Sequence, residues 1–329
     1  MRGGRIRGAV GLLAFLSMWA IVPTAQAQLD DDSGSSVAHD DSRAFGAPAD
    51  GVVRFSPRWD TIVFTEGRSL FGGGTGSTTS WASLFSLEVD LGFLVLRAIV
   101  PFSFGHLSNT VAGRTMNDDQ AELGNLTFEG YANIELGPEH RLLVGGGIAL
   151  PTATDQRCGS FSEGCIRGPL VRTIAWVTSF RSAAAWADQS FSIVPTAEYR
   201  LGIPWFLFSA IGAIPVFIPT DSRLGGPLAR GNVELMLALD VSGAVRIVNI
   251  VDVGISFLAW AMPSGAGMMG NPDLGQTALS FFVRTDPELD APITGGAEFI
   301  LDLDNSWGPT GDNGKFWGLR LFIGGRFDV

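Results

Sequence analysis

A strict two-residue alternation of apolar and polar side chains limits the fold of this sequence more than any other feature. Between Leu126 and Leu136, the even positions are apolar or glycine, whereas the odd positions carry Thr, Glu, Tyr, Asn and Glu. A β-strand directs successive side chains to opposite faces, so this segment predicts a strand with one apolar and one polar face. The same alternation recurs in residues 81–89, 233–241, 297–304 and 317–328.

A soluble antiparallel sandwich would also alternate, but three observations favour a membrane barrel. The alternating segments are longer than the ~5–6 residues of typical soluble strands and match the ~9–11 residues of a tilted bilayer crossing. Short connections (90–93, 137–140, 202–204 and 248–251) alternate with long polar ones, as in outer-membrane barrels with tight periplasmic turns. Aromatic residues that suit membrane interfaces stand at strand ends: Trp81, Trp205, Phe206, Trp317 and Phe327.

We therefore predict an all-β fold: a transmembrane antiparallel up-and-down β-barrel of about 12 strands. An even number of crossings returns both ends of the barrel to the periplasmic side, and ten or fourteen crossings are alternatives. Pro57 interrupts the first predicted strand, and 205–219 is apolar on both faces, so its register cannot be read. The predicted crossings are 52–65, 80–90, 94–105, 123–136, 141–152, 190–202, 205–219, 232–247, 251–263, 276–287, 294–305 and 315–329.

The segment before the barrel has the features of an export signal. Residues 1–27 combine three early arginines, an apolar core and the sequence Ala25-Gln26-Ala27, which predicts a cleaved signal peptide in a Gram-negative bacterium. The apolar core is shorter than the ~20 residues of a membrane anchor helix. Removing the three arginines changes the formal net charge from −11 to −14, which argues against a nucleic-acid partner. Residues 28–51 predict an acidic, disordered periplasmic lead-in, with a calcium site as the minor alternative, and 52–329 form the barrel.

The longest connection, 153–189, holds the only two cysteines of the chain, Cys158 and Cys165. In an exported protein this pair predicts a disulfide that closes a small loop. Gly168-Pro169 then opens a stretch suited to a short helix, since proline is well placed at a first helical position. This helix could be a cap packed over the barrel mouth or an inward-folded constriction.

Chemistry typical of enzymes is scarce in the sequence. The three histidines, His39, His106 and His140, do not form a recognisable nucleophile–base arrangement, and no phosphate loop, redox motif or metal-ligand cluster predicts a cofactor. We expect no enzymatic activity; a protease or lipase at the barrel rim near His106 is a remote alternative.

Strand parity assigns a set of charged and polar side chains to the barrel interior. They could form a structural ion-pair network, a pore lining, or both, and a small acidic excess among them predicts a weak cation preference. A porin-like passive channel for small molecules is the expected function, and a non-conducting structural or surface-interaction barrel is the alternative. The predicted lumen-lining residues are Arg97, Glu129, Asn133, Glu135, Glu198, Arg200, Glu234, Asp240, Arg246, Asp252, Arg284, Glu298, Asp302, Arg320 and Arg326.

Two stretches resemble a known family. The run 123–131, with Leu-Gly-Asn-Leu-Thr at its start, and the strand 143–152, ending in Leu-Pro-Thr, resemble the phenol-degradation MetA-pathway outer-membrane proteins, although Ala153 stands where that family has Gly. The resemblance implies a barrel that passes or binds small molecules and gives no binding residues. The C-terminal alternation resembles the signal read by the barrel-assembly machinery, with Val329 in place of the usual aromatic residue. The expected partners are thus this machinery, outer-membrane lipid and small-molecule solutes.

Overall fold

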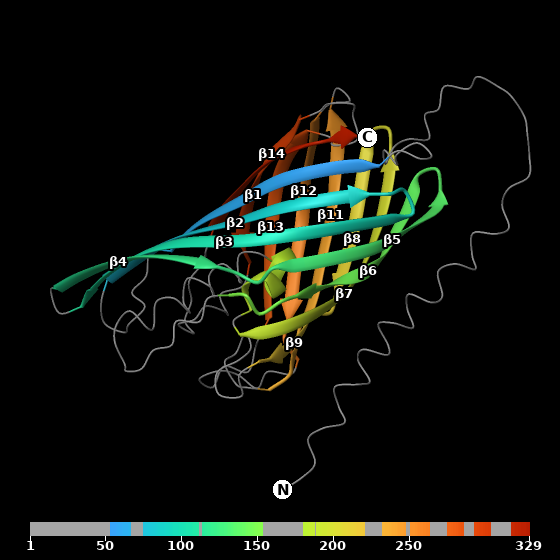
Figure 1. Ribbon diagram of the computed structural model, residues 1–329. Helices are drawn as coiled ribbons and strands as arrows, with labels where there is room; N and C mark the ends of the chain where they lie inside the picture. The colour runs from blue at the N-terminus through green and yellow to red at the C-terminus, as the bar shows by residue number, and fades with distance from the viewer. Residues whose placement is uncertain are drawn as a thin grey trace, which may run out of the picture. The chain divides into compact units, whose positions relative to one another are not determined.

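The computed structural model describes ten stretches of the chain, which form strands and one short 3-10 helix, η2 (Phe180–Trp186). The described residues are 53–66, 75–111, 114–153, 180–187, 189–220, 232–247, 251–263, 275–285, 293–303 and 317–329. The strands (Figure 1) are β1 (Arg54–Glu66), β2 (Thr75–Asp90), β3 (Leu94–Val111), β4 (Arg114–Leu123), β5 (Thr127–Gly137), β6 (His140–Ala149), β7 (Ser190–Ile203), β8 (Phe206–Ala213), β9 (Val216–Pro219), β10 (Glu234–Leu235), β11 (Leu237–Ile247), β12 (Val251–Ala261), β13 (Gly275–Thr285), β14 (Ile293–Asp302), β15 (Trp317–Gly325) and β16 (Phe327–Asp328).

These strands form a closed antiparallel barrel with twelve crossings, as the alternation predicts. Around the barrel the order is β7, β6, β5, β3, β2, β1, β15, β14, β13, β12, β11 and β8, and the pairing of β8 with β7 closes the ring. Four crossings consist of two segments each: β4 with β5, β8 with β9, β10 with β11, and β15 with β16. We call the end with turns 91–93, 138–139 and 204–205 the short-turn end, and the opposite end the long-loop end.

All four interruptions lie opposite, at or beside a proline, and in three of them the prolines are Pro101, Pro195 and Pro215. Because proline has no N–H to donate, the ladder loses a bond there and the pairing resumes on either side. Pro101 lies between the part of β3 that pairs with β5 and the part that pairs with β4. On β7, Pro195 lies between the part that pairs with β9 and the part that pairs with β8. Pro215 separates β8 from β9 along the chain and lies opposite the break between β10 and β11. Each proline carbonyl accepts an amide at the break: Gly124 N to Pro101 O at 3.0 Å, Ile214 N to Pro195 O at 2.9 Å and Met236 N to Pro215 O at 2.9 Å.

Pro57 acts on its neighbour rather than on its own strand. β1 is continuous through Pro57, which corrects the expectation that this residue interrupts the first crossing. The interruption lies instead in the partner crossing: β1 pairs with β16 at Arg54 and Phe55, and with β15 only from Arg58 onward. The proline therefore explains why β15 and β16 are separate segments.

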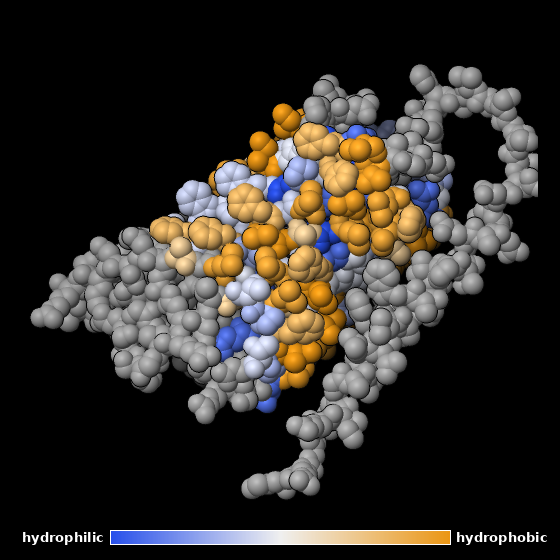
Figure 2. Space-filling view, in the orientation of Figure 1, coloured by the Kyte–Doolittle hydropathy of each residue, from blue (hydrophilic) through white to orange (hydrophobic). Residues whose placement is uncertain are grey.

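The two faces of the barrel wall differ in polarity as the alternation predicts. Along β2, Trp81, Phe85 and Leu87 are exposed on the outside, whereas Ala82 between them is buried. Along β11, Leu237 and Leu239 are exposed and Asp240 is buried. Figure 2 shows the resulting outer surface, on which apolar side chains cover most of the described strands. A band of this kind suits the hydrocarbon core of a bilayer.

Among the described residues, no helix is both long and apolar enough to cross a membrane.

Several predicted features lie outside the described residues. These are the signal peptide 1–27, the lead-in 28–51, the cysteine pair Cys158 and Cys165, and the helix expected from Gly168-Pro169 onward. They stay predictions. The described end of the long connection forms η2, a 3-10 helix, so the predicted short helix is not confirmed.

Candidate functional site

The interior of the barrel holds chains of paired charges that run from strand to strand. On one side, Glu298 of β14 accepts a bond from Arg320 of β15, with 3.1 Å between oxygen and nitrogen. Arg320 also contacts Asp60 of β1 at 2.8 Å, and both oxygens of Asp60 accept bonds from Arg58, at 2.7 and 2.8 Å. The carboxylate of Asp60 is therefore held between two guanidinium groups from adjacent crossings.

A second chain of charges lies on β2, β3, β5 and β7. Arg97 of β3 contacts Glu88 of β2 at 2.5 Å and Glu129 of β5 at 3.2 Å. On β7, Arg200 donates to both oxygens of Glu198, at 2.7 and 3.0 Å. Alternate positions on one strand share a face, which is why Glu198 and Arg200 meet.

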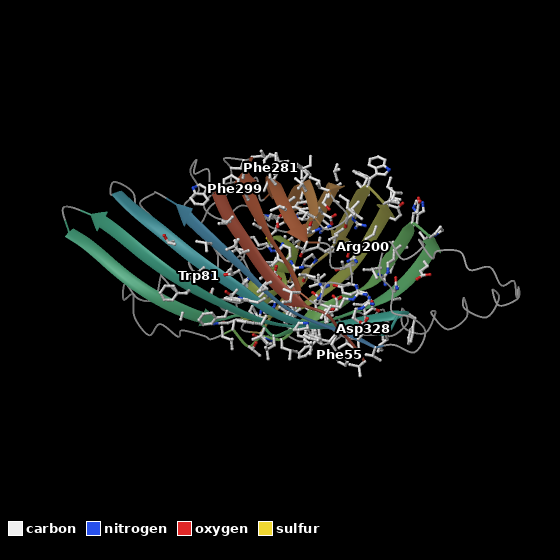
Figure 3. All side chains as sticks on the ribbon, turned by 90° about the horizontal axis from the view of Figure 1, so that it is seen from above. Phe55, Trp81, Arg200, Phe281, Phe299 and Asp328 are labelled. Carbon is white, nitrogen blue, oxygen red and sulfur yellow. The ribbon has the colours of Figure 1, made fainter. Side chains whose placement is uncertain are left out.

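These groups face a common interior space. In the sheet, β3, β5 and β6 separate β2 from β7, yet Glu88 of β2 interacts electrostatically with Arg200 of β7. This interaction links strands that are not neighbours in the wall, which places both groups on the inside of the barrel. In Figure 3 the label of Arg200 lies among the strands, whereas Phe281 lies at their upper edge.

A third cluster is centred on Asp252, whose side chain is fully buried on β12. One oxygen contacts Arg246 Nε of β11 at 3.3 Å and the other contacts Arg284 Nε of β13 at 3.4 Å. Nearer the long-loop end, Asp240 accepts the hydroxyl of Ser256 at 2.5 Å. The buried carboxylates of β11 and β12 thus each have partners on a neighbouring strand.

The structure brings together most of the residues that strand parity selects. The pairs Arg97–Glu129, Glu198–Arg200, Arg246–Asp252, Asp252–Arg284 and Glu298–Arg320 consist of predicted residues on both sides. Asn133 accepts a bond from Arg141 and donates to the carbonyl of Gly92 at 2.6 Å, Glu234 is buried, and Arg326 lies 3.9 Å from Asp328. Glu135 is exposed, and the side chain of Asp302 lies outside the described residues. Their role as a pore lining stays a prediction.

The sequence does not predict three charged residues of these clusters, Arg58, Asp60 and Glu88, or the further pair Asp90 and Arg141, whose side chains lie 3.8 Å apart. The signal for Glu88 was present, because it shares the even-numbered face of 81–89 with Ala82. Arg58 and Asp60 come after Pro57, at which the first strand was expected to be interrupted. Asp90 and Arg141 stand near strand ends, where alternation predicts the face of a residue least well.

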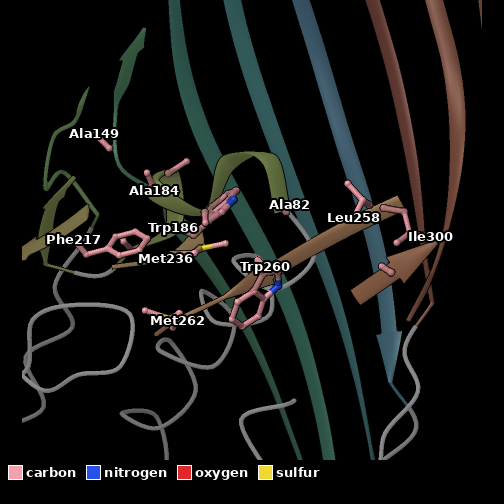
Figure 4. Packing of buried hydrophobic residues seen from close by; sticks show 14 residues of the cluster. Ala82, Ala149, Ala184, Trp186, Phe217, Met236, Leu258, Trp260, Met262 and Ile300 are labelled. Carbon is pink, nitrogen blue, oxygen red and sulfur yellow. The ribbon is translucent and has the colours of Figure 1, made fainter. Parts of the chain in front are cut away.

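Toward the long-loop end the interior holds an apolar cluster beside buried polar groups such as Glu234. Trp186 and the alanines of η2 are buried in a cluster that includes Phe217, Met236 and Trp260 (Figure 4). Helix η2 contacts β3, β7, β11 and β12, and five crossings separate β3 from β12 in either direction around the barrel. The helix therefore bridges opposite walls, an arrangement that favours an inward-folded constriction over a cap.

Asn125, in the break between β4 and β5, attaches η2 to the wall. Its amide nitrogen donates to the carbonyls of Ala187 and Ala184, at 2.5 and 3.2 Å, and its side-chain oxygen accepts the amide of Ala153 at 3.0 Å. The backbone amide of Asn125 donates to Ala185 O at 2.7 Å. Next to it, a Cβ on Gly124 would lie 2.4 Å from Ala185 O, so only glycine allows this close approach.

The histidines give no catalytic arrangement in the described part of the chain. His140 Nδ1 lies 2.6 Å from the hydroxyl of Tyr199, and the side chain of His106 and all of His39 lie outside the described residues. The described residues also contain no group of three or more acidic, histidine or cysteine side chains that could hold a metal ion.

Comparison with known proteins identifies the fold. No family model matches the sequence, and no curated protein is detectably similar to it. The structure is similar to an outer-membrane channel from Pseudomonas putida F1, with a TM-score of 0.55 and 12% identity over 91% of this chain and 100% of that one. The NanC porin (TM-score 0.46, 9% identity, 82% and 98% coverage) and the KdgM porin (0.40, 6%, 83% and 99%) are more distant. The fold is that of outer-membrane β-barrels, and the MetA-pathway resemblance gains no support from these matches.

Proposed function

We propose that this chain is an outer-membrane channel that passes small molecules passively. The observation that carries the proposal is that the interior charges of the closed barrel are paired but not fully covered: the side chains of Arg58, Arg97 and Arg284 keep about a third or more of their surface exposed. Exposed surface on the inward face requires space inside the wall. Eight strands leave an interior filled by side chains and sixteen leave an open pore, so twelve suit a narrow passage.

The remaining expectations belong to the same proposal. A signal peptide directs the chain across the inner membrane, the barrel-assembly machinery inserts it, and lipid covers the outer surface. The proposal includes no catalytic step.

A non-conducting structural or surface-interaction barrel is the second candidate. It is favoured by η2 and the apolar cluster, which occupy the interior toward the long-loop end. The two candidates differ in one measurable property, because a barrel closed by η2 would carry no ions.

Conductance of the purified protein in planar lipid bilayers tests the proposal. The protein should first show the heat-dependent shift in gel mobility that distinguishes a folded barrel from an unfolded chain. Folded protein is expected to give discrete steps of small conductance. Folded protein without any steps, under both signs of voltage, would exclude the open channel and favour the second candidate.

A further inference from the structure

Several interior ion pairs of this barrel are unequal in their exposure, although Arg97 and Glu88 are nearly equally exposed, at 34% and 28%. The arginine side chain is the more exposed partner in each of three pairs from different walls: Arg58 with Asp60 (40% and 7%), Arg200 with Glu198 (31% and 16%), and Arg284 with Asp252 (37% and 0%). Arginine has the longer side chain, so its head group extends further from the wall than the carboxylate that it binds. In these pairs the interior space therefore meets guanidinium groups more than carboxylates.

The hydrogen bonds orient these guanidinium groups. Arg58 binds both oxygens of Asp60 through Nε and Nη2, and Arg200 binds Glu198 through the same edge. This bidentate contact uses one edge of a planar group that has five donors. The Arg58 guanidinium also lies over the ring of Phe322, 4.0 Å from its centre, which fixes its plane.

Three of the arginines converge. Glu88 interacts electrostatically with Arg97, Arg200 and Arg58, which come from β3, β7 and β1. Arg97 and Arg58 also interact with each other. Guanidinium groups from three parts of the wall thus share one region of the interior, toward the short-turn end from η2. We call Arg58, Arg97 and Arg200 the arginine cluster.

We propose that the arginine cluster makes the passage prefer anions, and that its substrates are small organic carboxylates. The proposal rests on the proposed channel function and replaces the weak cation preference expected from counting charges. A permeating ion interacts most strongly with the charges nearest to it, and in the pairs of Arg58 and Arg200 the less exposed carboxylates lie behind the guanidinium groups. Planar, forked guanidinium donors match the geometry of a carboxylate.

Reversal potentials in a potassium chloride gradient test the preference. The wild-type channel is expected to pass chloride over potassium by about threefold or more, even though the chain has a formal net charge of −11. Succinate added to one side should reduce the chloride current in a concentration-dependent manner, whereas succinamide, its neutral analogue, should not.

Removing whole ion pairs, which leaves the net charge unchanged, tests whether the arginine cluster causes the chloride preference. The double variants R58Q/D60N and R200Q/E198Q each remove one guanidinium and its less exposed carboxylate partner, so the net charge of the interior is unchanged. Both should lower the chloride preference and weaken the succinate block. The matched control is R54Q/D328N, a pair at the end of the barrel in which the carboxylate is the more exposed partner; it should keep the wild-type preference.

Each outcome has one meaning. A folded barrel without conductance would overturn the channel function itself. A channel that prefers potassium, or shows no preference, would overturn the anion proposal while the channel function stands. A chloride preference that persists in both double variants would likewise overturn the anion proposal while the channel function stands. Should these fail to fold, R58K and R200K keep the charge but lose the planar fork: retained chloride preference with weaker succinate block supports the proposal, and an unchanged block contradicts it.

Discussion

At the residue scale, the buried carboxylates connect neighbouring crossings, and Asp60 is the clearest case. It accepts bonds from Arg58 on its own strand and from Arg320 on β15, which also binds Glu298 of β14. Removing one member of a buried ion network leaves the opposite charges without their partner, which costs more than removing an exposed pair. Asp328 offers the contrast, because its carboxylate binds Arg54 but is about half exposed.

We predict that D60N lowers the free energy of unfolding by about 3 kcal/mol, whereas D328N changes it by less than about 1 kcal/mol. Asparagine keeps the size of the side chain but removes the charge that Arg58 and Arg320 share. Urea titrations of the refolded barrel in lipid vesicles, followed by tryptophan fluorescence, measure both values. Equal effects of the two substitutions would show that burial inside this barrel does not strengthen the network.

Residue-level prediction from the sequence worked where parity was uninterrupted. The alternation in 126–136 and 233–241 selected Glu129 and Asp240. Asp240 is buried, Glu129 is partly buried, and both have interior polar partners. Parity could not give the exposure of each charge, because that depends on side-chain length and on the cross-strand partner. The anion preference inferred from Arg58 and Arg200 therefore needed the structure.

At the element scale, prolines explain where crossings divide. The sequence showed Pro101, Pro195 and Pro215 within predicted strands, and the total of twelve crossings was predicted despite them. The sequence did not show that the break appears in the neighbouring strand, because its position depends on which backbone carbonyl of that strand loses its N–H donor. The stretch 124–126 is such a break, and there the bonds of Asn125 and Thr152 join it to residues 152–153 and to residues 184–187.

We predict that N125A loosens η2 and increases the single-channel conductance. The substitution removes bonds to Ala184, Ala187 and Ala153, and losing the partners of buried polar groups costs about 1–3 kcal/mol at this junction. Bilayer recordings that compare wild type with N125A measure the effect. N133A is the control, since Asn133 bonds to Arg141 and to the Gly92 carbonyl in the short-turn half, away from η2. A conductance that rises equally in both variants would contradict a specific role of η2.

At the scale of the whole molecule, the alternation specifies a barrel wall with an apolar outer face and a polar inner face. The interior then differs in polarity from one end of the barrel to the other. Charged pairs occupy the part toward the short-turn end, and an apolar cluster around Trp186 occupies the part toward the long-loop end. The outer chemistry was predictable because every strand repeats it. The inner division was not, because η2 enters the barrel from a connection whose sequence has no β periodicity.

The tryptophans provide a test of this arrangement in a membrane, because they stand in three different environments. Trp205 is exposed at the short-turn end, Trp317 is exposed near the long-loop end of β15, and Trp186 is buried inside. In variants that keep one tryptophan each, lipids brominated near the headgroup should quench Trp205 and Trp317 more strongly than lipids brominated at mid-chain, since aromatic residues at the two edges of a barrel lie at the membrane interfaces. Trp186 should be quenched by neither lipid. Strong quenching of Trp186 by mid-chain bromine would mean that η2 lies outside the wall, in contact with lipid, and would remove the structural basis for a constriction.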